Sequence, residues 1–263
     1  MLQAMKPHVK QVIGGISHTA AQKSYVRQIL FNAMAKRADD VARLQEMEEI
    51  RFLGHVFLNL PQANAQILQD LWVTFETGGR RDGFFVEFGA TNGRTNSNTF
   101  LLEDGYGWTG ILAEPNPIWH ADLARNRGCA IEHRCIAARS GETVEFLATD
   151  DPELSALATC AANDHFASVR STAPRIKVDT LSLNDLLAEH GAPRRIDYMS
   201  VDTEGSELEI MRAFDFDRYD VRLLSIEHNN TSNEAGLDAL MQARGYVRRF
   251  PEYSQWDAWY RKA

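Results

Sequence analysis

A short apolar segment that runs into a glycine turn restricts the folds open to this chain more than any other feature. Residues 84–88, Phe-Phe-Val-Glu-Phe, are bounded by turn residues and are typical of a buried strand. Gly89 and Gly93 then allow a tight turn that can approach a ligand without a Cβ in the way. We expect a side chain at position 89 to block ligand binding and to leave the fold near native.

The segment after the turn completes a recognisable unit. A helix is expected over 97–104, and a second apolar strand over 109–113 ends in Glu114. Strand, glycine turn, helix and a strand that ends in an acid form the first half of a nucleotide-binding α/β unit. A carboxylate can accept two hydrogen bonds from a ribose diol, so we expect Glu114 to bind the ribose of a cofactor.

The spacing of the glycines narrows the choice of ligand. A dinucleotide site requires G-x-G-x-x-G, whereas here Gly89 and Gly93 are separated by three residues and no third glycine follows. No lysine of the phosphate-binding loop type is present either. A turn without a phosphate cradle suits a nucleoside that carries no phosphate, such as S-adenosylmethionine. The alternative is an ordinary strand–turn–helix that binds nothing.

Polar residues also follow two later apolar segments, 196–201 and 221–226. Asp202 comes directly after the first, and Glu227 and His228 come directly after the second. In α/β sheets, ligands bind outside the carboxyl ends of the strands, so these side chains are expected to face the same crevice as the glycine turn.

Three blocks in this chain, in the same order, resemble the FkbM-type S-adenosylmethionine-dependent methyltransferases. They are residues 86–93 with 97–99 and 107–117, then residues 196–207, then residues 224–229. The resemblance covers about residues 66–260. It implies transfer of a methyl group from S-adenosylmethionine to a hydroxyl of a sugar, a glycan or a natural-product small molecule.

The resemblance and the strand pattern together suggest a set of cofactor-binding residues. Ile136 and Ala137 are included because they follow a predicted third strand over 130–135, where an adenine would lie. Asn64 and Gln66 are weaker candidates. The full set is Glu87, Gly89, Ala90, Asn92, Ser97, Glu114, Pro115, Ile136, Ala137 and Asp202.

Methyl transfer to a hydroxyl needs positioning of the two reactants and removal of the hydroxyl proton. His228 is the favoured base because its ordinary pKa is about 6.5, with Asp202 orienting the acceptor or holding a metal. Asp202 could itself be the base if desolvation or Glu204 raised its pKa. A third possibility is Mg²⁺ or Mn²⁺ bound by Asp202, Glu227 and either His228 or Asn229, since oxygen-rich ligands with one imidazole suit these ions.

The predicted fold is an α/β, doubly wound, Rossmann-like class I methyltransferase sheet over residues 61–263, with a reversed edge hairpin formed by 246–250 and 257–261. Residues 1–60 are predicted to be a helical N-terminal extension, because apolar residues recur at three- and four-residue steps over 19–53. This extension could be an arm, a lid or the surface of a homodimer. Further strands are expected over 143–147 and 176–178, and helices over 66–76, 118–127, 180–190 and 207–214.

Residues 149–175 are polar and irregular, which is usual for a functional or mobile loop. We expect this loop to bind the acceptor, and His165 within it is a reserve candidate for the base.

Charge and composition exclude several classes of partner. The chain has 28 basic and 36 acidic residues and a net charge of -8, which gives no overall attraction to nucleic acid or to an anionic membrane. No segment approaches the ~20 apolar residues that a membrane-spanning helix needs. Three cysteines without a zinc spacing or a signal peptide suggest a cytoplasmic location.

Two other classes of function remain open. One is an NAD-linked oxidoreductase or epimerase on a Rossmann-like fold, which the missing third glycine and the absence of a Tyr-x-x-x-Lys pair disfavour. The other is a non-catalytic S-adenosylmethionine-binding module.

Overall fold

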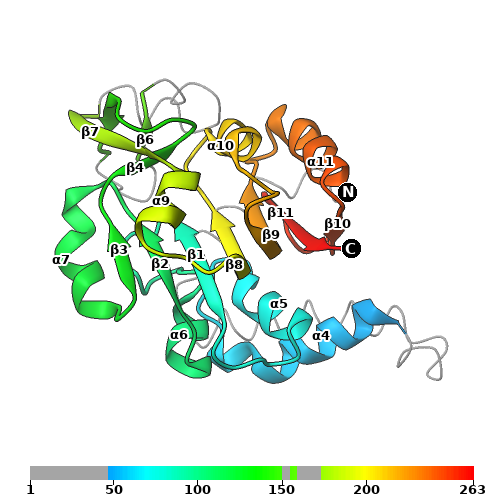
Figure 1. Cartoon of the computed structure of the whole chain (residues 1–263). Coiled ribbons are helices and arrows are strands. Elements are labelled where there is room, and N and C mark those ends of the chain that lie inside the picture. Colours follow the sequence, from blue (N-terminus) through cyan, green and yellow to red (C-terminus); the bar gives the residue numbers. More distant parts are fainter. Residues whose placement is uncertain (1–46, 150–154, 159–172) are drawn as a thin grey trace. The chain divides into compact units, whose positions relative to one another are not determined.

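The computed structural model describes residues 47–149, 155–158 and 173–263 (Figure 1). The described residues fall into two compact units, one of residues 47–81 with 95–106 and one of residues 82–94 with 107–263. The predicted helices before residue 47, and His165 in the predicted acceptor loop, lie outside the described residues. The domain boundary at residue 60 and the dimer surface therefore stay predictions.

The first unit is helical. Its elements are α4 (Glu48–Asn59), η1 (Leu60–Gln62), α5 (Gln69–Glu76) and α6 (Phe100–Tyr106). Phe52 of α4 meets Phe75 of α5 edge to face, with ring centroids 5.4 Å apart. The α6 helix begins at Phe100, three residues later than predicted, because the Ser97 hydroxyl first accepts the N–H groups of Thr99 and Phe100.

A buried carboxylate fixes the start of α5. Asp70 accepts hydrogen bonds from the backbone N–H groups of Asn64, Ala65 and Leu71, at 2.6 to 3.1 Å. Burial raises the pKa of Asp70 to about 6, although these three N–H groups oppose the rise. The predicted helix over 66–76 accordingly begins only at Gln69.

The second unit is built on a mixed sheet. Its strands lie in the order β10 (Tyr246–Arg249), β11 (Asp257–Lys262), β9 (Asp220–Glu227), β8 (Arg195–Val201), β1 (Phe84–Phe88), β2 (Thr109–Ala113) and β3 (Ala130–Glu132). Among these strands, β11 alone runs against the others, between β9 and β10. This confirms the predicted doubly wound sheet with a reversed edge hairpin (Figure 1).

A second, smaller sheet departs from the prediction. It contains β4 (Cys135–Ala137), β7 (Arg175–Ser182), β5 (Thr143–Leu147) and β6 (Ala156–Leu157), in that order. The predicted third strand over 130–135 is thus divided between the two sheets. The helix predicted over 180–190 begins only at Leu183, because Thr180 still pairs with Cys135 and donates its N–H to Glu142 O.

Four helices belong to the second unit within the described residues: α7 (Pro117–Asn126), α9 (Leu183–Glu189), α10 (Glu207–Ala213) and α11 (Asn233–Ala243). The Asn116 side chain caps α7 and the Ser182 side chain caps α9. We did not predict α11, which packs against β10 and α10 (Figure 1).

Strand register divides the side chains of the large sheet between two faces. Val86 pairs with Met199, and both lie in an apolar cluster with residues of α9, α10 and α11. Glu87 pairs with Ser200, and Ser200 with Ser225, on the opposite face. The sheet therefore has one face that is largely apolar and one face that carries polar groups towards its carboxyl edge.

Among the described helices, none combines the length and apolar character needed to cross a membrane.

Candidate functional site

The candidate site lies where the winding of the sheet reverses. The chain passes from β1 to β2 on one side, and later returns to place β8 on the other side of β1. Ligands of doubly wound sheets bind at the carboxyl ends of the strands at this point. The segments that meet there are the turn after β1, the residue after β2 and the residues after β8.

The Gly89 turn touches both neighbouring strands. Its N–H donates to Ala113 O at 3.1 Å, and its backbone has a φ of +69°. A Cβ at this position would lie 2.3 Å from the backbone oxygen of Asp202. The prediction that a side chain at Gly89 would leave the fold near native is therefore wrong, because the clash falls on the neighbouring chain segment.

Glu114 is buried and ties this turn to the end of β2. Its Oε2 accepts the N–H of Thr91 at 2.8 Å, and its Oε1 accepts the N–H of Asn116 at 2.7 Å. Burial raises the pKa of Glu114 to about 7, and the two backbone N–H groups limit that rise. Each carboxylate oxygen keeps one further lone pair, so the group can still accept two hydrogen bonds from a ligand.

Glu87 has a structural partner that the sequence did not reveal. Its Oε2 lies 3.7 Å from Nη1 of Arg127, and both side chains are buried. The same Nη1 donates to Gly93 O at 3.0 Å, and the guanidinium lies over the Phe85 ring, 5.3 Å from its centroid. Arg127 thus joins the glycine turn, β1 and the end of α7.

The remaining cofactor candidates lie in different surroundings. Ala90 is buried in the turn, while Asn92 and Pro115 are half-buried in the segments after β1 and β2. Ile136 is buried in the main apolar cluster and Ala137 is half-buried, and both lie on β4 instead of in a loop. Ser97 belongs to the helical unit, where it caps the start of α6.

Three carboxyl groups gather beyond β8 and β9. One oxygen from each of Asp202, Glu204 and Glu227 lies within 4.8 Å of the others. Strand register brings Asp202 and Glu227 close together, because Val201 pairs with Ile226 and each acid directly follows one of these paired residues. Glu204 is brought back towards them by a turn in which its own φ is +59°.

The electrostatics of this carboxylate cluster, Asp202 with Glu204 and Glu227, are unfavourable for three full charges. Burial, and then the neighbouring carboxylates of Asp257 and Glu207, raise the pKa of Asp202 to about 8. Burial and the Asp202 charge also raise the pKa of Glu227 well above its ordinary value. Because both pKa values are raised, one of these two neighbouring groups can keep a proton near pH 7.

Glu207 shapes the turn that carries Glu204. Its Oε1 accepts the backbone N–H groups of Thr203 and Gly205, at 3.0 and 2.9 Å, and the hydroxyl of Thr203. Asn229 adds a hydrogen bond from its side-chain amide to Glu204 Oε2 at 3.4 Å. The carboxylate cluster is therefore held by contacts from both of the segments that supply it.

His228 follows Glu227 but is engaged elsewhere. Its Nδ1 accepts the N–H of Asn230 at 3.0 Å, and its Nε2 lies 3.7 Å from Glu234 and 3.3 Å from Arg248. The side chain is 1% exposed, and burial lowers its pKa. Within the described residues, the group of side chains placed to share a cation consists of Asp202, Glu204 and Glu227. The His228 imidazole does not belong to that group.

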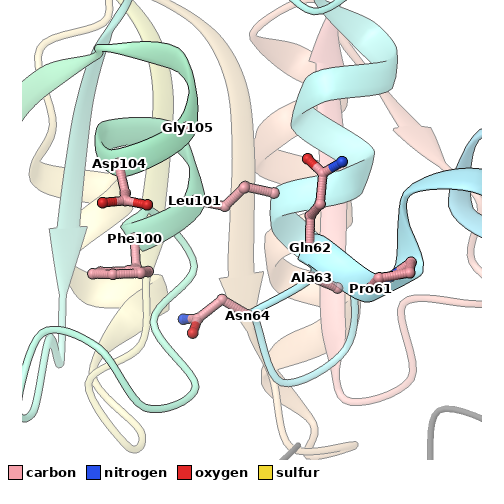
Figure 2. A pocket seen from close by; sticks show the side chains of 8 residues that line it. All are labelled: Pro61, Gln62, Ala63, Asn64, Phe100, Leu101, Asp104 and Gly105. Carbon is pink, nitrogen blue, oxygen red and sulfur yellow. The ribbon is translucent and has the colours of Figure 1, made fainter.

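A separate cavity of about 370 Å³ lies in the helical unit (Figure 2). Its lining residues are Pro61, Gln62, Ala63, Asn64, Phe100, Leu101, Asp104 and Gly105. Of the sequence-based candidates it contains only Asn64, whose side-chain amide donates to Ser97 O at 3.0 Å. Figure 2 shows all of these lining residues around the cavity.

Among the comparisons with known proteins, a family model gives the clearest finding. The model of the methyltransferase FkbM domain matches residues 87–259, well over half of the 263 residues. A comparison with curated proteins finds no match.

Solved structures give a weaker likeness. A mutant of MtNAS in complex with S-adenosylmethionine is 13% identical, with a TM-score of 0.36 over 99% of this chain and 91% of that chain. MtNAS in complex with MTA and tNA is also 13% identical, with a TM-score of 0.35 over 100% of this chain and 90% of that one. At these values, the likeness carries no part of the assignment. On the family match, the chain belongs to the FkbM methyltransferase family and is an S-adenosylmethionine-dependent methyltransferase.

Proposed function

We propose that this protein transfers a methyl group from S-adenosylmethionine to a hydroxyl of a sugar, a glycan or a natural-product small molecule. The observation that carries the proposal is the position of the Gly89 turn between Glu114 on one side and Asp202 on the other. A nucleoside-binding acid and a proton-accepting acid thus border one glycine turn at the carboxyl edge of the sheet.

The cofactor half of the proposal depends on Glu114. Its two remaining lone pairs match the two hydroxyl donors of a ribose, and its fixed hydrogen bonds to the backbone orient it before the ligand arrives. The turn residues Gly89, Ala90 and Asn92, with Pro115, are proposed to lie against the nucleoside. Within the same unit, Ile136, Ala137, Glu87 and Asp202 complete the proposed set, with Ile136 and Ala137 towards the adenine.

The acceptor half depends on the carboxylate cluster. In-line transfer to a hydroxyl requires the oxygen to be held against the methyl carbon while a nearby group takes the proton. Asp202 suits this role, because it is half-buried and follows the strand next to the glycine turn. His228, favoured from the sequence, has its Nδ1 occupied and its Nε2 directed towards Glu234 and Arg248.

The charge of the cluster favours a neutral acceptor. Asp202, Glu204 and Glu227 would repel phosphate or carboxylate groups, whereas each can accept hydrogen bonds from the hydroxyls of a sugar. We therefore propose polyhydroxylated acceptors ahead of acidic ones.

Calorimetric titration followed by a methyl-transfer assay tests this function. S-adenosylhomocysteine should bind, and label from S-adenosylmethionine should appear on one member of a panel of neutral sugars, glycans and hydroxylated natural products. Binding of NADH in its place would favour the oxidoreductase alternative. Cofactor binding without transfer to any acceptor in the panel would favour the non-catalytic binding module.

A further inference from the structure

The carboxylate cluster has the dimensions of a divalent cation site. Calcium binds oxygen ligands at about 2.3–2.6 Å, so ligands on opposite sides of the ion are roughly 4.6–5.2 Å apart, and Mg²⁺ requires somewhat shorter separations. The three oxygens of Asp202, Glu204 and Glu227 all lie within 4.8 Å of one another. They could thus surround one ion with little movement of the side chains.

A second observation, independent of the spacing, points to an occupant. Glu227 is 6% exposed, and its Oε2 is buried without a hydrogen-bond partner in the described part of the protein. A buried carboxylate oxygen without a partner costs free energy unless something binds it.

A small cavity adjoins this carboxylate. It has a volume of about 10 Å³, enough for one water molecule or one ion, and six of its seven lining residues carry polar side chains. The lining residues are Gly205, Glu207, Glu227, His228, Asn229, Thr231 and Asn233. The cavity offers a space next to Glu227 from which an ion or its bound water can complete a ligand shell.

Within the described residues, no basic side chain neutralises Asp202 or Glu227. Among the described residues, Arg127 pairs with Glu87, and Arg248 pairs with Glu234 and Asp238. Neither Asp202 nor Glu227 forms an ion pair with a basic side chain in that part of the chain.

We propose that Asp202, Glu204 and Glu227 bind one divalent cation that prefers oxygen ligands, such as Mg²⁺, Mn²⁺ or Ca²⁺. This ligand set differs from the one expected from the sequence, because Glu204 takes the place of His228. Asn229 orients the Glu204 carboxylate by its hydrogen bond to Oε2, as groups behind the ligands commonly do in metal sites.

The inference deepens the proposed function. Binding of the cation stands on the geometry alone, whereas its use in catalysis rests on the proposed methyl transfer. A divalent cation at this position would lower the pKa of an acceptor hydroxyl that it binds. In that case Asp202 would hold the ion and orient the acceptor, and a weaker base would be sufficient to remove the hydroxyl proton.

Titration with Mn²⁺ alone tests the site without cofactor or acceptor. Binding is followed by calorimetry and by the loss of the free-ion electron paramagnetic resonance signal. The wild-type chain should bind one ion, and Glu227→Gln and Asp202→Asn should each weaken binding more than about tenfold. Asp217→Asn, which removes an exposed acid from the same unit, is the matched control and should bind as the wild type does.

Thermal unfolding supplies a second readout on the same samples. Mn²⁺ should raise the unfolding temperature of the wild type and of Asp217→Asn, but not that of Glu227→Gln, because only a bound ion stabilises the folded state. If Glu227→Gln fails to fold, Asp202→Asn carries both readouts.

Absence of Mn²⁺ binding at millimolar concentration, or equal binding by the wild type and both cluster variants, would overturn the proposal. The carboxyl groups would then share protons, and the cavity would hold only water. A protein that binds Mn²⁺ but not S-adenosylhomocysteine would retain the cation site and lose the proposed function. The two failures are therefore distinguishable.

Discussion

At the scale of single residues, the cofactor-binding role proposed for Glu114 predicts that cofactor affinity depends on pH. Its pKa is about 7 in the protein, and only the ionised group can accept two hydrogen bonds from a ribose diol. A ligand that requires the ionised form binds more weakly as the pH falls through that pKa. We expect the affinity for S-adenosylhomocysteine to fall between pH 7 and pH 5, by up to about tenfold per pH unit.

Substitution at Glu114 supplies the control for this pH dependence. In Glu114→Gln, the amide can accept only one of the two backbone N–H groups and faces the other with a donor, which costs ~1–3 kcal/mol of stability. Affinity should be lower and no longer change between pH 5 and 7. Glu209→Gln, on an exposed position of α10, should keep the wild-type profile. If the affinity of Glu114→Gln for S-adenosylhomocysteine still fell between pH 7 and pH 5, a group other than Glu114 would be responsible for the pH dependence.

A pair of variants at His228 separates a structural role from a catalytic one. Asn has a side-chain oxygen near the position of Nδ1 and can still accept the Asn230 N–H, whereas Ala cannot. We expect His228→Asn to keep turnover within roughly tenfold of the wild type, and His228→Ala to lose ~1–3 kcal/mol of stability.

Asp202→Asn should behave differently from both His228 variants. It should lower turnover by ~10²–10⁴-fold, whether the carboxylate takes the proton or holds an ion. The measurement is single-turnover methyl transfer with saturating cofactor. A loss of that size in a folded His228→Asn variant would restore His228 as the base.

At the scale of elements, the turn after β1 is constrained by its neighbour. A side chain at Gly89 meets the Asp202 carbonyl, while one at Gly141 meets nothing within 4 Å, and both glycines have positive φ. Gly141→Ala should cost only the ~1–2 kcal/mol of a left-handed backbone. Gly89→Ala should cost clearly more, as measured by urea unfolding. If the two variants lost equal free energy of unfolding, the segment after β8 would have to move away from the new side chain at little cost.

The elements also show how far the sequence leads. The β1 turn and the strands ending near Glu114, Asp202 and Glu227 were predictable, because apolar segments, glycines and acids occur in a fixed local order. The division between β3 and β4 was not, since it depends on pairing with β7, some forty residues later.

The details of the candidate site depend on contacts between residues far apart in the chain, and no local sequence pattern indicates such contacts. The Glu87–Arg127 pair joins residues forty positions apart, and Glu114 binds the N–H of Thr91, whose side-chain identity is irrelevant to that bond. His228 was favoured because of its ordinary pKa, but the direction of its ring is set by Asn230 and Arg248. Sequence order thus led to the candidate site but could not assign a role to each of its residues.

At the scale of the whole molecule, the residues proposed to meet the cofactor are spread over several elements, so the ligand should report on global stability. Gly89, Glu114 and Asp202 all belong to the unit of residues 82–94 and 107–263. A ligand that binds only the folded state at a hundred times its dissociation constant stabilises that state by ~2.7 kcal/mol. For a chain of this size, the unfolding temperature should rise by roughly 5–10 °C.

Thermal unfolding with S-adenosylhomocysteine, and with NADH as the control ligand, measures this shift. NADH should produce none, because the glycine turn lacks the third glycine of a dinucleotide site. If the two compact units unfold separately, two transitions will appear, and only the one of the larger unit should move. A shift confined to the smaller, helical unit would contradict the proposed site, since it would place the nucleoside away from Glu114 and the Gly89 turn.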